Sequence, residues 1–319
     1  MTRKLLTTAF IFTAVAAANA QTDTIAGNKL DEVIVTANKF PQKQSTTGKV
    51  ITVITKDEIE KNTGKTLSQL LNEQAGVTIN GALNNAGAIQ TVYVRGAASG
   101  RTLILLDGIP VNDPSMINNE FDLNLFSLDN IDRIEICKGA QSTLYGSDAI
   151  AGVINVITVS RDVTRPVNVK ATLSEGNLGT FRGNVQLYGK KDKLTYSVRH
   201  ARLFTNGFSS AYDSTGNKNF DKDGYDGNVT NAQLLFQTNK ALSLKSFLMY
   251  SRYKADIDAG VFADEKDYRI DNSTFTTGAG FNYKKGIVTL NGTYQYSELK
   301  RNYFNDSIHK TSIIFEDNK

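Results

Sequence analysis

The chain has 319 residues, of which 40% are hydrophobic, and a formal net charge of +4 from 36 Lys and Arg against 32 Asp and Glu. This length is enough for two domains with cores of their own. The charges form no polybasic run, so we expect no nucleic-acid partner. No segment after the N-terminus approaches 18 consecutive apolar residues, a pattern that argues against a helical membrane protein.

The N-terminus has the three regions of a secretory signal peptide. Arg3 and Lys4 precede a mostly apolar run over residues 5–18, and Ala18 and Ala20 form a small-residue cleavage site. This order predicts a signal peptide over residues 1–20 that is removed on export. The alternative is a short buried N-terminal helix.

A short β-branched segment follows a polar linker. Residues 33–36 read Val-Ile-Val-Thr after two acidic residues, Asp31 and Glu32, and we identify no hairpin partner nearby in the sequence. An ordinary edge strand is one interpretation. The other is a segment that lends its backbone to the sheet of a partner protein.

Residues 41–160 mix strand and helix patterns. Thr55 with Glu58 three residues later forms a capping-box pattern, which predicts a helix over about 56–62. Leu67, Leu70 and Leu71 share one face of a second predicted helix over 66–73. The expected strands of this region are 49–54, 77–79, 92–94 and a hairpin over 102–112 that turns at Asp107 and Gly108.

The stretch 134–158 closes this α+β region. Its β-branched runs around Ile134 and Val153 are separated by Gly139 and Gly146, so we predict a strand, a turn, a short helical bend and a second strand. The single cysteine, Cys137, lies in the first apolar run and is expected to be a buried packing residue.

From Pro166 onward the apolar residues alternate with polar ones. The alternation is clearest over residues 288–297, and short turns such as 284–286 alternate with long polar segments at 205–229 and 255–272. Alternating strands with short turns at one end and long loops at the other are typical of an outer-membrane barrel. A soluble β-sandwich is the alternative.

Three of these motifs resemble TonB-dependent outer-membrane receptors, and in particular the cobalamin (vitamin B12) receptors. They are the closing stretch 134–158, the strand that ends in Arg95 and Gly96, and the run Leu106, Asp107 and Gly108 followed by Asn112. The resemblance implies an α+β plug domain followed by the first strands of an antiparallel transmembrane β-barrel. About seven or eight strands fit after Pro166, whereas a plugged transporter has about 22, so we expect the barrel to be incomplete.

The same resemblance implies the organisation and the function. The expected parts are a signal peptide (1–20), a linker with the TonB box (21–40, box 31–37), a plug domain (41–160) and a partial β-barrel (161–319). The implied function is TonB-dependent import of cobalamin across the cell outer membrane, with no enzymatic activity. Alternatives are an iron-siderophore or haem receptor of the same fold, or a soluble β-rich periplasmic binding protein.

The resemblance also assigns partners to particular residues. The periplasmic domain of TonB is expected to contact Asp31, Glu32, Val33, Ile34, Val35, Thr36 and Ala37. A plug–barrel lock is expected at Arg95 and Lys138, facing glutamates on the barrel wall. Lysine and Ala140 stand where the family commonly has arginine and proline, and lysine cannot form the bidentate fork of arginine. Outer-membrane lipid and a small-molecule ligand, cobalamin or an iron chelate, are the other expected partners.

Aspartates crowd the two long loops, and oxygen ligands at this density suit calcium. Asp and Gly also crowd solvated turns, so composition alone leaves both interpretations open. The cobalamin receptors that the chain resembles hold structural calcium with aspartates of these loops. The implied ligands here are Asp213, Asp221, Asp223, Asp258 and Asp264.

Overall fold

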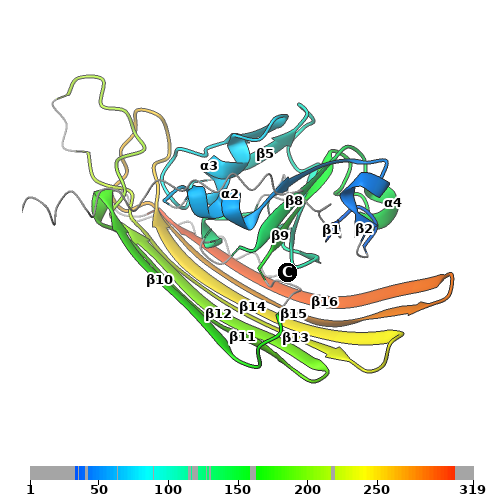
Figure 1. Ribbon diagram of the computed structural model, residues 1–319. Coiled ribbons are helices and arrows are strands. Elements are labelled where there is room, and N and C mark those ends of the chain that lie inside the picture. Colours follow the sequence, from blue (N-terminus) through cyan, green and yellow to red (C-terminus); the bar gives the residue numbers. More distant parts are fainter. Residues whose placement is uncertain are drawn as a thin grey trace, which may run out of the picture.

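The computed structural model describes residues 33–34, 36–39, 42–62, 64–88, 90–113, 116, 121–126, 128, 131–158, 163–216 and 220–305. An α+β plug packs on the concave face of a long curved sheet (Figure 1). The predicted signal peptide lies outside the described residues, as do Asp31, Glu32 and Val35. No helix within the described ranges is long and apolar enough to cross a membrane.

The plug is built on a five-stranded mixed sheet with the order β3-β8-β9-β6-β7. β6 and β9 are parallel, and the other neighbours are antiparallel. β8 and β9, with the helical turn α4 (Ser142–Tyr145) between them, confirm the pattern predicted for residues 134–158. The strands are β3 (Val50–Ile54), β6 (Thr102–Leu106), β7 (Ile109–Pro110), β8 (Arg133–Lys138) and β9 (Gly152–Ile157).

Two short helices cover one face of this sheet, and each begins at a capping box. In α2 (Lys56–Lys61), Thr55 and Glu58 satisfy each other's backbone N–H groups, as the sequence pattern predicts. In α3 (Leu67–Asn72), Thr66 and Gln69 do the same. A separate hairpin of β4 (Val77–Asn80) and β5 (Thr91–Val94) follows α3.

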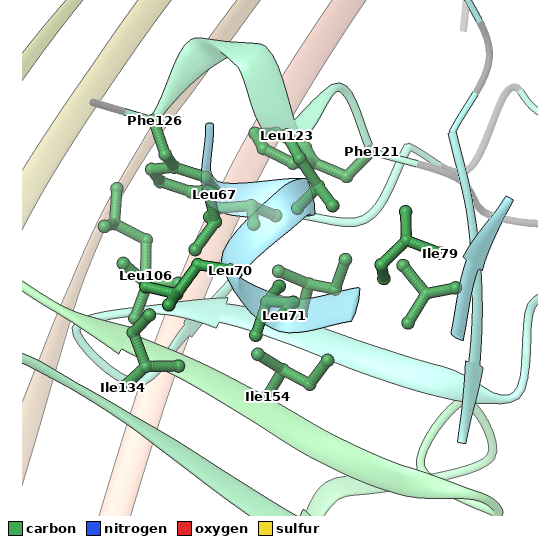
Figure 2. Close-up of a cluster of buried hydrophobic side chains, with 14 of the residues drawn as sticks. Leu67, Leu70, Leu71, Ile79, Leu106, Phe121, Leu123, Phe126, Ile134 and Ile154 are labelled. Carbon is green, nitrogen blue, oxygen red and sulfur yellow. The ribbon is translucent and has the colours of Figure 1, made fainter. Parts of the chain in front are cut away.

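The main core lies between α3 and the sheet. Figure 2 shows Leu70 and Leu71 directed toward Ile134 and Ile154 of the central strands. Leu67, Leu70 and Leu71 are buried, which confirms the helix face predicted from their spacing. The same apolar cluster continues into side chains of the long sheet, including Tyr225 and Met249, so the plug and the sheet share a core.

The other face of the plug sheet is covered by α4 (Ser142–Tyr145) and by the N-terminal segment. Ile34 and Ala37 are buried in a second apolar cluster with Leu105, Val153 and Cys137. The expectation that residues 33–36 have no hairpin partner nearby is wrong: β1 (Val33–Ile34) pairs antiparallel with β2 (Gln42–Lys43). The polar pair Gln42 and Lys43 carries no strand pattern of its own, which is why the sequence does not reveal it.

The long sheet is an antiparallel meander in which each strand pairs with the next, in the order β10 to β16. The predicted fold class is confirmed: the plug is followed by antiparallel strands of a partial barrel, and the described sheet does not close. The strands are β10 (Asn168–Gly176), β11 (Thr180–Lys191), β12 (Leu194–Thr205), β13 (Tyr225–Gln237), β14 (Leu242–Asp256), β15 (Arg269–Lys285) and β16 (Val288–Phe304).

β13 and β15 begin earlier than the sequence pattern predicts, so the long connections are 206–224 and 257–268. The added residues at the start of these two strands are largely polar, so the apolar alternation in the sequence predicts a loop there. Asp226 of β13, for example, forms an exposed ion pair with Arg202 of β12. A cross-strand pair of this kind supports strand structure without apolar alternation.

The outer face of the long sheet carries exposed apolar side chains, whereas the inner face carries buried polar side chains as well as the apolar ones that join the plug core. In β11 the polar residues Asn184 and Gln186 are buried toward the plug, whereas Val185 and Leu187 are exposed on the outer face. β14 follows the same rule on its outer face with Leu244 and Leu248. Apolar side chains exposed on the outer face are typical of a membrane barrel, whereas a soluble sandwich has polar side chains there.

Candidate functional site

Three aspartates from the two long loops converge at the loop end of the sheet. The carboxylate oxygens of Asp221, Asp223 and Asp258 all lie within 4.8 Å of one another. Asp221 and Asp223 precede β13, and Asp258 follows β14, which pairs with β13 over its full length. Strand pairing therefore brings together residues that are more than thirty positions apart.

Backbone N–H groups of the loops fix these carboxylates. Asp223 Oδ2 accepts from Ser210 N at 2.5 Å. Asp258 Oδ2 accepts from Ala211 N at 2.7 Å, and its Oδ1 accepts from Glu265 N at 2.9 Å. The two loops are thus connected through Asp258, and each anchored carboxylate can still offer lone pairs to a cation.

Burial, together with neighbouring carboxyl groups, raises the pKa of two members of the cluster. Burial raises the pKa of Asp223 to about 6, with a further contribution from the charge of Asp258, although hydrogen bonds from Ser210 act in the opposite direction. Burial also raises the pKa of Asp221, and the carboxyl group of Asp264 adds to the effect. The buried Oδ1 of Asp221 accepts no hydrogen bond from the described residues. This donor set, all oxygen and anionic, fits a hard divalent cation such as calcium.

The two other predicted calcium ligands occupy different positions. Asp264 Oδ1 accepts from Asp221 N at 3.1 Å, which places Asp264 at the edge of the cluster. Asp213 accepts from Thr215 N and Thr215 Oγ1 at 2.9 and 2.8 Å, so it forms a local turn in the first loop. The structure brings Asp221, Asp223 and Asp258 together and does not place Asp213 among them.

The predicted TonB-contact segment is described only in part. Val33 and Ile34 form β1, and the side chains of Ile34, Thr36 and Ala37 are buried on the plug. In Figure 1, β1 lies at the end of the plug opposite the two long loops. The aspartate cluster and this segment therefore occupy opposite ends of the molecule.

The two residues of the predicted plug–barrel lock lie close to each other. Arg95 is exposed and has a left-handed backbone with φ of 53°. Lys138 Nζ donates to the carbonyl oxygen of Ala75 at 2.6 Å. Burial and then the Arg95 charge lower the pKa of Lys138. Among the described residues neither forms an ion pair with a carboxylate, and the lock stays a prediction.

Other plug–sheet contacts were not anticipated from the sequence. Arg301 of β16 forms an ion pair with Asp113 of the plug at 2.5 Å, and both side chains are largely buried. Tyr225 of β13 donates its hydroxyl to Asp122 at 3.1 Å. Asn85 accepts from the backbone N–H of Phe208 in the first long loop at 3.1 Å. No local pattern marks these residues, because each partner lies more than 100 positions away.

Residues 43–153 match the family described as TonB-dependent Receptor Plug Domain. The match spans the plug sheet from β3 into β9 together with both capped helices. The fold and this match define the class: the chain contains a TonB-dependent receptor plug domain, followed by a sheet of the kind that forms the barrel of such receptors.

The curated relatives include vitamin B12 transporters. The chain is 41% identical over 145 residues to the vitamin B12 transporter BtuB of Vibrio cholerae, a match that covers 45% of this chain and 23% of that protein. It is 35% identical over 169 residues to BtuB of Vibrio vulnificus, which covers 53% of this chain and 25% of that protein. The chain therefore matches about a quarter of the length of these relatives.

Solved structures with the same fold include siderophore receptors. A ferric enterobactin receptor, PfeA of Pseudomonas aeruginosa, superposes with a TM-score of 0.64 at 17% identity, covering 85% of this chain and 45% of that chain. The ferric yersiniabactin uptake receptor FyuA of Yersinia pestis superposes with a TM-score of 0.61 at 17% identity, covering 82% and 43%. At this identity the likeness establishes the fold alone.

Proposed function

We propose that this chain is part of an outer-membrane receptor that imports a scarce nutrient, cobalamin, with energy supplied through TonB. The observation that carries the proposal is the plug packed against the inner face of a sheet whose outer face carries exposed apolar side chains. A plug in such a position blocks the path through the barrel until something moves it. The function is transport without catalysis.

Cobalamin is the proposed ligand because the relatives at 35–41% identity are named vitamin B12 transporters. Siderophore receptors share the fold at 17% identity, and an iron chelate is the alternative ligand. The ligand would reach the plug from the end where the long loops lie, since those loops contact the plug through Asn85.

The experiment that tests the ligand is equilibrium binding to the protein extracted from outer membranes in detergent. Cyanocobalamin and ferric enterobactin are compared at equal concentration. Saturable binding of cyanocobalamin that the siderophore does not compete supports the proposal. Binding of the iron chelate without binding of cyanocobalamin favours the siderophore receptor, and recovery of the protein from the periplasm without detergent favours the soluble alternative.

Calcium is the proposed structural ion of the loop end. Asp221, Asp223 and Asp258 would hold it, with Asp264 beside them. The ion would neutralise carboxylates that otherwise repel one another, and would thereby order the two long loops through which the ligand enters. Calcium-dependent protection of residues 206–224 and 257–268 from protease tests this role.

TonB is the proposed partner at the opposite end, through residues 31–37. Pairing as an added strand depends on backbone hydrogen bonds, so Val35→Pro is expected to abolish capture of the TonB periplasmic domain, whereas Val35→Thr is not. Equal capture by Val35→Pro and the unmodified chain would exclude this mode of contact.

A further inference from the structure

Lysines gather in the hairpin turns at one end of the long sheet. The turns join β11 to β12, β13 to β14 and β15 to β16, and these pairs are antiparallel, so all three turns lie at the same end. Figure 1 shows this end away from the two long loops. The lysines in the turns or next to them are Lys190, Lys191, Lys193, Lys240, Lys284 and Lys285.

The short turns carry almost no negative charge. Within residues 190–193, 238–241 and 284–287, which are all described, Asp192 is the single acid. The side chains of Lys191, Lys240 and Lys285 are exposed, and none of these three lysines forms an ion pair with a carboxylate of the described residues. Three turns at one end of the sheet therefore present positive charge to the surroundings.

The loop end of the same sheet is different, because acids accompany its cations. Arg202 of β12 forms an ion pair with Asp226 of β13 at 3.0 Å. Lys300 of β16 forms one with Glu298 at 3.1 Å. The positive charge of the short turns is thus a property of one end of the sheet and not of the whole surface.

The lysines directly border the apolar side chains of the outer face. Lys191 is the cross-strand neighbour of Leu194, and the same row continues across the sheet through Phe236, Leu244 and Phe281. These four apolar side chains are exposed. Since directly opposed residues of an antiparallel pair share a face, Lys191 lies on the same face as the apolar row.

The turn between β15 and β16 combines both features. Ile287 in this turn is fully exposed, and Lys285 is the cross-strand neighbour of Val288, a further exposed apolar residue. A lysine stem can lie along apolar surface while its ammonium group reaches a polar headgroup. Exposed apolar residues beside lysines therefore suit the boundary between the hydrocarbon and the headgroups of a bilayer.

We propose that the short-turn rim, defined as Lys191, Lys240, Lys285 and Ile287, binds the phosphate groups of anionic phospholipids in the leaflet at that end. This inference rests on the membrane placement in the proposed function and adds the charge of the lipid to it. Lipid is favoured over a soluble acidic protein because the rim is continuous with the exposed apolar side chains of the outer face. Charge and apolar surface then meet one partner together.

Flotation of vesicles with the full chain tests the rim. Vesicles of phosphatidylcholine alone are compared with vesicles of phosphatidylcholine and phosphatidylglycerol, and the ratio of the two affinities gives the preference for anionic lipid. We expect the triple variant Lys191→Gln, Lys240→Gln, Lys285→Gln to lose about 100-fold of this preference, since each lysine near an anionic surface contributes roughly fivefold.

The matched control removes the same charge elsewhere. Lys61→Gln, Lys222→Gln and Lys266→Gln change exposed lysines of α2 and of the two long loops. This control should keep the preference of the unmodified chain. An equal loss of preference in the two triple variants would overturn the rim, because net charge alone would then explain the binding.

A polarity-sensitive dye gives an independent readout of position. The native Cys137 is buried, so Ile287→Cys provides an accessible thiol for labelling. We expect the emission of the dye to shift to the blue on vesicles that contain phosphatidylglycerol. A dye on Val261→Cys, an exposed position in the second long loop, should not shift. An unshifted dye at residue 287 would contradict the rim.

The remaining outcomes separate the rim from the proposed function. Equal affinity of the unmodified chain for both kinds of vesicle would refute the rim and leave the membrane placement standing. Failure to bind either kind would refute both. Retention on isolated peptidoglycan that requires the three lysines, without a lipid preference, would assign the rim to the wall polymer and overturn the lipid contact.

Discussion

The carboxylates of Asp221, Asp223 and Asp258 repel one another at their distances, and no cation of the described residues forms an ion pair with them. Each N–H group that reaches Asp223 and Asp258 comes from a loop backbone, so the side chains are held in place without being neutralised. A bound divalent ion would supply the missing positive charge. This expectation gives two predictions for single residues.

Asp223→Asn is expected to lower calcium affinity by about tenfold or more, because the variant keeps the shape of the site and removes one anionic ligand. Isothermal titration calorimetry on the full chain measures the change. Asp267→Asn, an exposed aspartate in the same loop as Asp258, is the matched control and should bind calcium as the unmodified chain does. Equal affinities of Asp223→Asn and the control would contradict the proposed site.

Calcium binding is also expected to weaken in acid. The folded-state pKa of Asp223 is raised to about 6, above the ordinary value of an aspartate. Without calcium the folded protein favours the protonated form of Asp223. This residue loses its proton as the pH rises through about 6, so its contribution to the stability of the folded protein falls there. Below about pH 6, calcium must displace that proton in order to bind. Its affinity should then fall by up to about tenfold for each unit by which the pH is lowered, for each proton displaced. Titrations at pH 7.5 and pH 5 test this, and a pH-independent affinity would refute it.

At the scale of single elements, α3 is a short helix that depends on its buried face. Six residues are too few for an isolated helix to be stable in water, so its packing against the sheet stabilises it. Leu71→Ala removes a fully buried side chain from that face and is expected to lower the free energy of unfolding by about 2–5 kcal/mol. Leu83→Ala, at a position that is 76% exposed, should change it by less than about 0.5 kcal/mol. Urea unfolding followed by circular dichroism compares the two variants.

The contact between the plug and β16 depends on a largely buried ion pair. Arg301→Met leaves the Asp113 carboxylate without this cation, and we expect a loss of about 3–5 kcal/mol of stability. The double variant Arg301→Met with Asp113→Leu removes both charges, so it should be more stable than the single variant. A double-mutant cycle measured by thermal unfolding tests this, and strictly additive effects would show that the two groups do not interact.

At the scale of the whole molecule, the predicted calcium site and the predicted TonB-contact segment lie at opposite ends. The aspartate cluster and the long loops lie at one end, and β1 lies at the other (Figure 1). The central strands β8 and β9 lie between them and carry Glu135 and Asn155, whose side chains form hydrogen bonds with Thr36.

The apolar outer face of the long sheet is expected to contact lipid. Leu248 of β14 is exposed on that face, whereas its neighbours Phe247 and Met249 are buried. Leu248→Lys should reduce insertion into phospholipid vesicles, with a cost of about 2–4 kcal/mol if the residue lies near the bilayer midplane. Flotation of the vesicles measures the inserted fraction. Ser246→Lys, at a position nearer the short turn before β14, should cost less. Equal effects of the two substitutions would contradict a position of Leu248 deeper in the bilayer than Ser246.

Features encoded within a few residues could be predicted from the sequence. The capping box of Thr55 and Glu58 closes over three positions, and the leucines of α3 repeat within one turn. Alternation along β11 and β16 likewise marks which side chains share a face. These patterns succeed because the interactions that they report are made between neighbours in the chain.

The sequence by itself thus determined the capped helices, the alternating strands and the plug motifs that match a known family, because local hydrogen bonding and periodicity encode them. Only the tertiary structure decided that Thr36 binds Glu135, that Asp113 meets Arg301, and that Asp258 joins Asp221 while Asp213 remains with Thr215. Each of the first three contacts joins residues brought together by strand pairing or by docking of the plug. The energy of such a contact depends on the distance between the two groups in space and not on their separation along the chain. No local sequence pattern therefore predicts these contacts.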